Sequence, residues 1–139
     1  AFIENFGLMR GAIASCIEHD SHNIIAVGCT DDEIAAAVNA LIDHRGGISV
    51  AEGREVHVLP LPVAGIMTNS DGYEVARRYT ELDALAKRLG TKLQAPFMTL
   101  SFMGLLVIPS LKLSDKGLFD GKAFRLIELS AAEVENSRR

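Results

Sequence analysis

The chain has 139 residues, of which 48% are hydrophobic and 23% charged, and its formal net charge is -4. This length suits a single ordinary domain, and the composition is that of a globular protein rather than a disordered one. Because the net charge is negative, Trp is absent and basic residues are scattered, the sequence argues against a nucleic-acid partner.

Two short apolar runs, residues 11–17 and 24–28, have the β-branched content and Gly boundaries of half-buried strands. We predict that they form a hairpin whose turn is the polar pentad His-Asp-Ser-His-Asn at residues 19–23. If the turn has only two central residues, His19 and His22 face each other across the strands, with Cβ atoms roughly 5 Å apart. Two imidazoles placed in this way could share a metal ion or a ligand.

The pentad offers chemistry of two kinds. His19, Asp20 and His22 are candidate ligands of a divalent metal such as zinc, and Asp20 could instead orient one imidazole. Ser21 and Asn23 could hydrogen-bond a substrate. The alternative is a plain polar turn whose side chains satisfy their own backbone, and spacing alone favours that alternative.

A helix is predicted over residues 31–45. Thr30 and Glu33 form a capping box at its start, and a Gly pair at residues 46–47 is the expected end signal. The apolar residues of the helix form one stripe at i, i+3, i+4, i+7 and i+8, namely Ile34, Ala37, Val38, Leu41 and Ile42.

The middle of the chain predicts a second hairpin and a second helix. Residues 48–51 and 55–59 alternate as strands around a Glu-Gly-Arg turn, and residues 71–89 have helical periodicity. The inner face of that helix comprises Val75, Tyr79, Leu82, Leu85, Ala86 and Leu89. The apolar stretch between two prolines, residues 97–108, is a core helix or strand and is too short to span a membrane.

The end of the chain predicts an edge strand at residues 111–113 and a last strand at residues 123–129, followed by a polar tail at residues 130–139. Together these elements predict an α+β domain, with a mainly antiparallel sheet built from hairpins and covered by two or more amphipathic helices.

Cys16 and Cys29 lie in or beside the first two predicted strands, so a bridge between them is geometrically conceivable. Two thiols in a chain without a secretory segment are more often reduced, which points to the cytoplasm. We expect both thiols to be buried and inert rather than metal ligands.

Four segments carry a family resemblance in their order and spacing. They are residues 11–28 with the pentad, the Pro-Leu-Pro segment at 60–67, the Pro-Phe-Met-Thr segment at 96–102, and residues 108–120 with Asp-Lys-Gly-Leu-Phe-Asp. Together they resemble the C-terminal domain of bacterial adenine deaminase, a member of the amidohydrolase superfamily. The resemblance covers the chain from about residue 2 to residue 129. It departs from the family pattern at Cys16, where Ser is usual, and at Leu106, where Pro is usual.

The resemblance implies a metal-dependent hydrolase that converts adenine to hypoxanthine and ammonia in purine salvage. Its divalent metals, manganese or iron, belong to a barrel that precedes this region. We therefore expect residues 1–129 to be a C-terminal domain cut from a longer chain and inactive alone. Its expected partners are the barrel of the same chain, adenine as the substrate of the whole enzyme, and further copies in a homo-oligomer. We expect no association with a membrane.

The resemblance leaves the role of the pentad open. In one interpretation the pentad supports catalysis in the whole enzyme, with His19 or His22 exchanging a proton or hydrogen bond with the purine. In a second, His19 and His22 bind zinc within the domain itself. Further alternatives are a self-contained metal-dependent hydrolase, and a purine-binding or oligomerisation module without chemistry.

Overall fold

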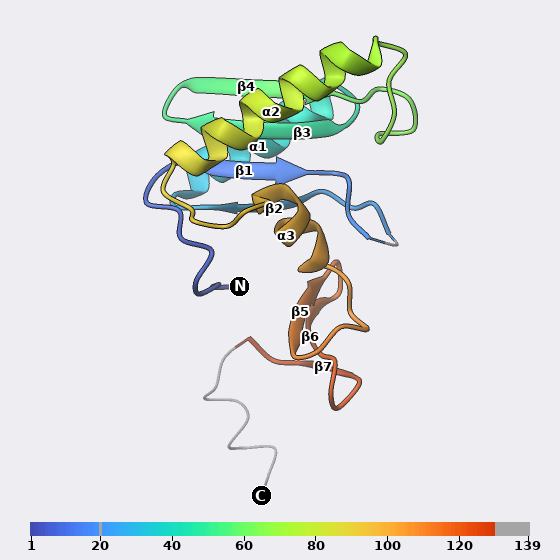
Figure 1. Cartoon of the computed structure of the whole chain (residues 1–139). Coiled ribbons are helices and arrows are strands. Elements are labelled where there is room, and N and C mark those ends of the chain that lie inside the picture. The colour runs from blue at the N-terminus through green and yellow to red at the C-terminus, as the bar shows by residue number, and fades with distance from the viewer. Residues whose placement is uncertain (20, 130–139) are drawn as a thin grey trace, which may run out of the picture.

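The computed structural model describes residues 1–19 and 21–129, and it confirms an α+β domain with two antiparallel sheets and three helices (Figure 1). The larger sheet has the strand order β2-β1-β3-β4, and the smaller sheet has the order β5-β6-β7. The strands are β1 (Ala12–Ser15), β2 (Ile25–Gly28), β3 (Gly47–Glu52), β4 (Glu55–Pro60), β5 (Leu111–Ser114), β6 (Gly117–Asp120) and β7 (Arg125–Ile127). The helices are α1 (Asp31–Asp43), α2 (Gly72–Arg88) and α3 (Pro96–Phe102).

The larger sheet lies between α1 on one face and α2 with α3 on the other (Figure 1). The face toward α1 carries small side chains, so the helix backbone can come close. The Ser49 hydroxyl donates a hydrogen bond to the Ala37 carbonyl of α1 at 2.9 Å. The residues that fill this layer are Ala12, Ala14 and Ala51 of the sheet with Ala37 and Leu41 of α1.

The opposite face carries the larger apolar side chains of the core. Ile13, Ile48 and Val50 of the sheet are at most 1% exposed. They pack with Leu82, Ala86 and Leu89, which are on the predicted inner face of α2, and with Phe97 and Leu100 of α3. Each of the Val, Leu, Ile and Phe side chains among them contributes roughly 1.5–3 kcal/mol through its removal from water. The predicted core element of residues 97–108 begins as helix α3 and continues as turns.

Helix α1 begins as predicted and ends two residues early. The Thr30 hydroxyl oxygen accepts a hydrogen bond from the Glu33 N–H at 3.3 Å, which is the expected N-cap contact. At the other end Arg45 adopts a left-handed φ of 60°, and the Gly46 N–H bonds back to the Leu41 carbonyl at 2.8 Å. This closing contact explains why the helix stops before residue 45.

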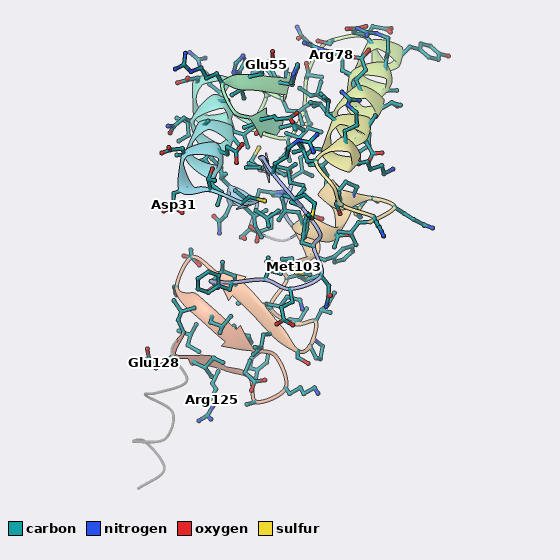
Figure 2. The ribbon with its side chains drawn as sticks, turned by 90° about the vertical axis from the view of Figure 1, so that its left-hand side faces the viewer. Asp31, Glu55, Arg78, Met103, Arg125 and Glu128 are labelled. Carbon is teal, nitrogen blue, oxygen red and sulfur yellow. The ribbon has the colours of Figure 1, made fainter. Side chains whose placement is uncertain are left out.

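The smaller sheet confirms the expected edge strand and last strand and adds β6, which had not been predicted as a separate strand. In β5 the polar residue faces inward and the apolar residues face outward, the reverse of the usual arrangement. Lys112 is buried, whereas Leu111 and Leu113 are 50% and 37% exposed. Figure 2 shows this sheet below the main body, with Met103 at the junction. Within residues 1–19 and 21–129 no helix has the length and apolar character needed to cross a membrane.

Candidate functional site

The β1–β2 loop, residues 16–24, carries the predicted site. The two strands pair antiparallel, and their last matched residues are Ser15 and Ile25. The prediction of a hairpin is thus confirmed, but the condition of a two-residue connection, on which the opposed histidines depended, is not met. His19 and His22 therefore do not occupy opposed strand positions.

Beyond β1, Cys16 continues the contact with the start of β3 and is also held by Gly65. Its N–H donates to the Gly47 carbonyl at 3.1 Å, and its sulfur accepts from the Gly47 N–H at 3.0 Å. The Cys16 thiol donates to the Gly65 carbonyl at 2.7 Å. One residue earlier, the Ser15 hydroxyl oxygen accepts from the Ile17 N–H at 2.9 Å, which bends the chain out of the strand.

The histidines of the loop have different surroundings. The His19 ring stacks on Phe102 at the end of α3, with ring centroids 4.3 Å apart and planes tilted by 33°. His22 is exposed and adopts a left-handed φ of 51°. Asp20 lies outside the described residues. The loop therefore offers two accessible imidazoles, one fixed against an aromatic ring and one at an unusual backbone position.

Glu18 is a residue of this loop that sequence reasoning missed. It is 5% exposed, and its Oε2 accepts hydrogen bonds from the Ser21 hydroxyl and the Asn23 N–H, both at 3.1 Å. No alternation in the sequence indicates its burial, because residues 11–16 before it are all buried.

Ser21 and Asn23 are exposed, and their polar groups also bond to each other. The Asn23 side-chain amide donates to the Ser21 hydroxyl oxygen at 3.2 Å. These contacts agree with the interpretation of a turn that satisfies its own polar groups. The substrate-binding role of Ser21 and Asn23 stays a prediction.

Within the part of the chain that the structure describes, no three His, Cys, Asp or Glu side chains form a group that could hold a metal ion. The described residues of the loop therefore do not fit a zinc site by themselves. The hypothesis that His19, Asp20 and His22 bind zinc together stays a prediction, because Asp20 lies outside those residues.

The two thiols are free and have different environments. Cys16 is buried, as expected, whereas Cys29 is exposed, so the expectation for Cys29 is wrong. Cys29 follows the last residue of β2 and its N–H bonds to the Gly11 carbonyl at 3.0 Å. Its backbone is thus fixed at the sheet while its side chain faces solvent.

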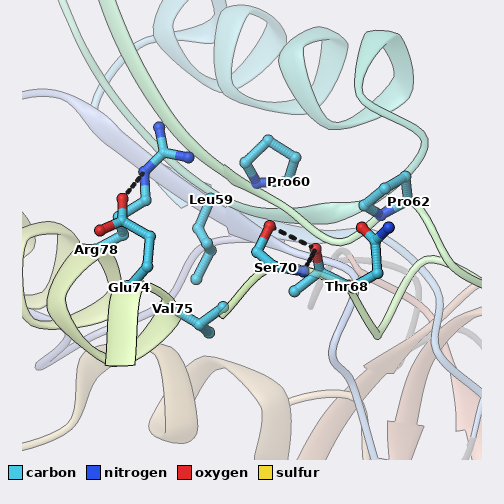
Figure 3. A pocket seen from close by; sticks show the side chains of 9 residues that line it. Leu59, Pro60, Pro62, Thr68, Ser70, Glu74, Val75 and Arg78 are labelled. Atoms are coloured by element: carbon cyan, nitrogen blue, oxygen red, sulfur yellow. Dashed lines mark hydrogen bonds and ion pairs between the residues drawn. The ribbon is translucent and has the colours of Figure 1, made fainter. Parts of the chain in front are cut away.

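A shallow pocket lies between the end of β4 and the start of α2 (Figure 3). Its volume of about 170 Å³ is below the range of roughly 300–1,000 Å³ that is typical of small-molecule sites. Four of its polar side chains have partners within the pocket: Thr68 donates to the Ser70 hydroxyl at 3.1 Å, and Arg78 lies 4.0 Å from Glu74. In the loop between β4 and α2 and in α2 itself, these side chains therefore interact with one another.

Residues 1–125 match the family described as "Adenine deaminase C-terminal domain". The chain belongs to this family. It is 60% identical over 129 residues to an adenine deaminase of Sulfurovum sp. (strain NBC37-1) and 60% identical over 132 residues to one of Methanosarcina barkeri. The matches cover 92% and 95% of this chain. An adenine deaminase of Archaeoglobus fulgidus is 49% identical over 131 residues, or 94% of this chain.

The chain spans about a quarter of the length of these relatives, since each match covers 24% of the relative. The resemblance that the four sequence segments carried is therefore confirmed. In this adenine deaminase C-terminal domain, the β1–β2 loop is the segment that brings accessible imidazoles, a hydroxyl and an amide together.

Proposed function

We propose that the protein carrying this domain hydrolyses adenine to hypoxanthine and ammonia, as an enzyme of purine salvage in the cytoplasm. The observation that supports the proposal is the family match over residues 1–125, together with close relatives named adenine deaminase. Because the domain spans 24% of such a relative, we assign the main catalytic apparatus to the other three-quarters of the protein.

The proposal includes a divalent metal, manganese or iron, held by an amidohydrolase barrel outside this domain. The described residues of the domain support this division, because they contain no group of three ligating side chains. The domain itself is then a support for the barrel, and its surface residues act by binding and orientation rather than by holding the metal.

Within that division of roles, we propose that the β1–β2 loop helps to complete the adenine pocket. His19 and His22 would exchange a proton or a hydrogen bond with the purine, and Ser21 and Asn23 would hydrogen-bond its polar edge. All four residues are exposed, so they can reach a molecule outside the domain. The stacking of His19 on Phe102 supports this role because it fixes one imidazole without covering it.

The reaction is tested by measuring hypoxanthine and ammonia formed from adenine by the full-length protein after loading with manganese. We expect one ammonia released for each hypoxanthine formed, and no turnover by the isolated domain under the same conditions. A full-length protein that is loaded with metal but leaves adenine unchanged would contradict the proposal. Turnover by the isolated domain would contradict the assignment of catalysis to the rest of the protein.

A second candidate is an oligomerisation module, which several exposed apolar side chains of the smaller sheet favour. Leu111 is 50% exposed, Leu126 is 50% exposed and Phe124 is 70% exposed. Sedimentation equilibrium of the full-length protein tests this role, with Leu111→Ser and Leu126→Ser as variants. We expect both variants to lower the average mass, and an unchanged mass would exclude the smaller sheet as the contact.

A further inference from the structure

Glu18 is a buried carboxylate that crosses the base of the β1–β2 loop. Its side chain is 5% exposed, and its Oε2 accepts from the Ser21 hydroxyl and the Asn23 N–H at 3.1 Å each. Hydrogen bonds to a charged acceptor are stronger than neutral ones, and removing the acceptor leaves a backbone N–H without its partner. Glu18, which directly precedes the polar pentad, thus bonds to its middle and to its end.

The seat of this carboxylate is the backbone that follows α3. A Cβ atom added to Gly104 would lie 1.2 Å from Oε1 of Glu18 and 2.3 Å from its Cδ, so a larger residue cannot occupy that position without moving the carboxylate. Two residues earlier, Phe102 stacks on His19. The end of α3 therefore holds the loop at two adjacent residues, Glu18 and His19.

We propose that Glu18 is a positioning residue for adenine deamination, with its carboxylate against Gly104 and the neighbouring His19 supported by Phe102. The carboxylate fixes the loop in the shape in which His19, Ser21 and Asn23 meet the purine. This inference rests on the proposed function. Active sites need their contacting groups held within about 0.5 Å of the productive geometry, and a buried carboxylate with two donors is suited to that task.

The structural half of the proposal is tested by hydrogen–deuterium exchange on the full-length protein. We expect Glu18→Ala to speed exchange of the Asn23 amide at least about tenfold, because that amide loses a charged acceptor. Gly104→Ala should have a similar effect by displacing the carboxylate. Glu55→Ala on β4 is the matched control, since Glu55 has a side chain that is 84% exposed. Unchanged exchange of amides in β1 and β3 shows that the domain still folds.

The functional half is tested by adenine kinetics on the same variants, with bound metal counted. We expect kcat/KM to fall at least about tenfold in Glu18→Ala, mainly through KM, while metal content stays at the wild-type level. Glu18→Gln keeps the size and one acceptor oxygen, so it should recover part of the loss. The double variant Glu18→Ala with Gly104→Ala should lose little more than either single variant, because both changes remove the same contact.

Two outcomes overturn the proposal. If Glu18→Ala leaves the exchange of Asn23 unchanged, the carboxylate does not hold the loop. If exchange rises but kcat/KM is unchanged, the loop is held for a reason other than adenine deamination. A wild-type protein that does not deaminate adenine would instead defeat the proposed function, and the exchange result would still decide whether Glu18 holds the loop.

Discussion

The carboxylate of Glu33 joins the start of α1 to two backbone segments that are distant in sequence. Its Oε1 accepts from the Gly53 N–H at 3.1 Å, and its Oε2 accepts from the Gly11 N–H at 3.1 Å and the Thr30 hydroxyl at 2.9 Å. The Gly53 N–H first, and then the Thr30 hydroxyl, lower the pKa of Glu33 because they stabilise its charged form.

This lowered pKa predicts how stability depends on pH. Because the folded-state pKa of Glu33 is below its unfolded-state value, its contribution is fully present above the unfolded-state pKa and is lost as the pH falls through the folded-state pKa. We expect Glu33→Gln to make the free energy of unfolding less sensitive to pH between about 6 and about 3. Urea unfolding at several pH values measures this difference.

The control for this prediction is Glu55→Gln, at a site whose side chain is 84% exposed. We expect this control to follow the wild-type pH dependence. If Glu33→Gln also runs parallel to the wild type over the whole range, its hydrogen bonds do not favour the charged carboxylate in the folded protein.

The two thiols predict different reactivities in the folded state. Cys29 is exposed, whereas Cys16 is 6% exposed and bonded to the backbone of Gly47 and Gly65. We expect an aromatic disulfide reagent to modify Cys29 rapidly in the folded domain and Cys16 only after unfolding, because attack needs an accessible thiol. Mass spectrometry of the modified peptides measures both sites, and Cys29→Ser is the control. Equal rates at the two sites would contradict the described burial.

At the scale of elements, the close contact between α1 and the larger sheet depends on small residues. A Cβ atom added to Gly28 at the end of β2 would lie 2.5 Å from the Ala12 Cβ and 2.7 Å from Cγ1 of Ile34. Gly28 therefore sits where β1, β2 and α1 meet, and the layer has no room for one more methyl group.

We expect Gly28→Ala to destabilise the domain by about 1–3 kcal/mol, the usual cost of overpacking a filled core. Gly72→Ala is the matched control, because an added Cβ there meets no atom within 4 Å and its φ lies outside the left-handed region. That control should be neutral or stabilise by about 0.4–1 kcal/mol. Urea unfolding of both variants measures the difference, and equal stabilities would show that α1 can move away from the sheet without cost.

Across the whole molecule, the sequence predicted those helices and strands whose ends are determined by residues within or next to the element. The strands on either side of residues 52–54 and the boundaries of α2 were predicted closely, because turn residues, caps and periodicity lie within each element. The opposed arrangement of His19 and His22 is not formed, because the pairing of β1 and β2 stops at Ser15 and Ile25. Cys16 at the start of the loop contacts Gly47 and Gly65, which lie far along the chain. The buried position of Glu18 depends likewise on Gly104.

The same distinction applies to the candidate site. The pentad was found from its composition, and the family was found from the order of four segments. The stacking of His19 on Phe102 and the burial of Glu18 against Gly104 could not be predicted, because Phe102 and Gly104 lie far along the chain from the pentad. For the whole molecule, we propose that this fixed loop serves the deamination of adenine.

The measurement that tests this claim most directly is adenine-to-hypoxanthine turnover by the manganese-loaded full-length protein, for wild type, His19→Ala and His22→Ala. Bound metal is counted in each, and His57→Ala, an exposed His on β4, is the control. We predict that at least one loop variant lowers turnover about 100-fold with metal retained, while the control is unaffected. Unchanged turnover and metal content in both loop variants would contradict a role of the loop in deamination and leave it a structural turn.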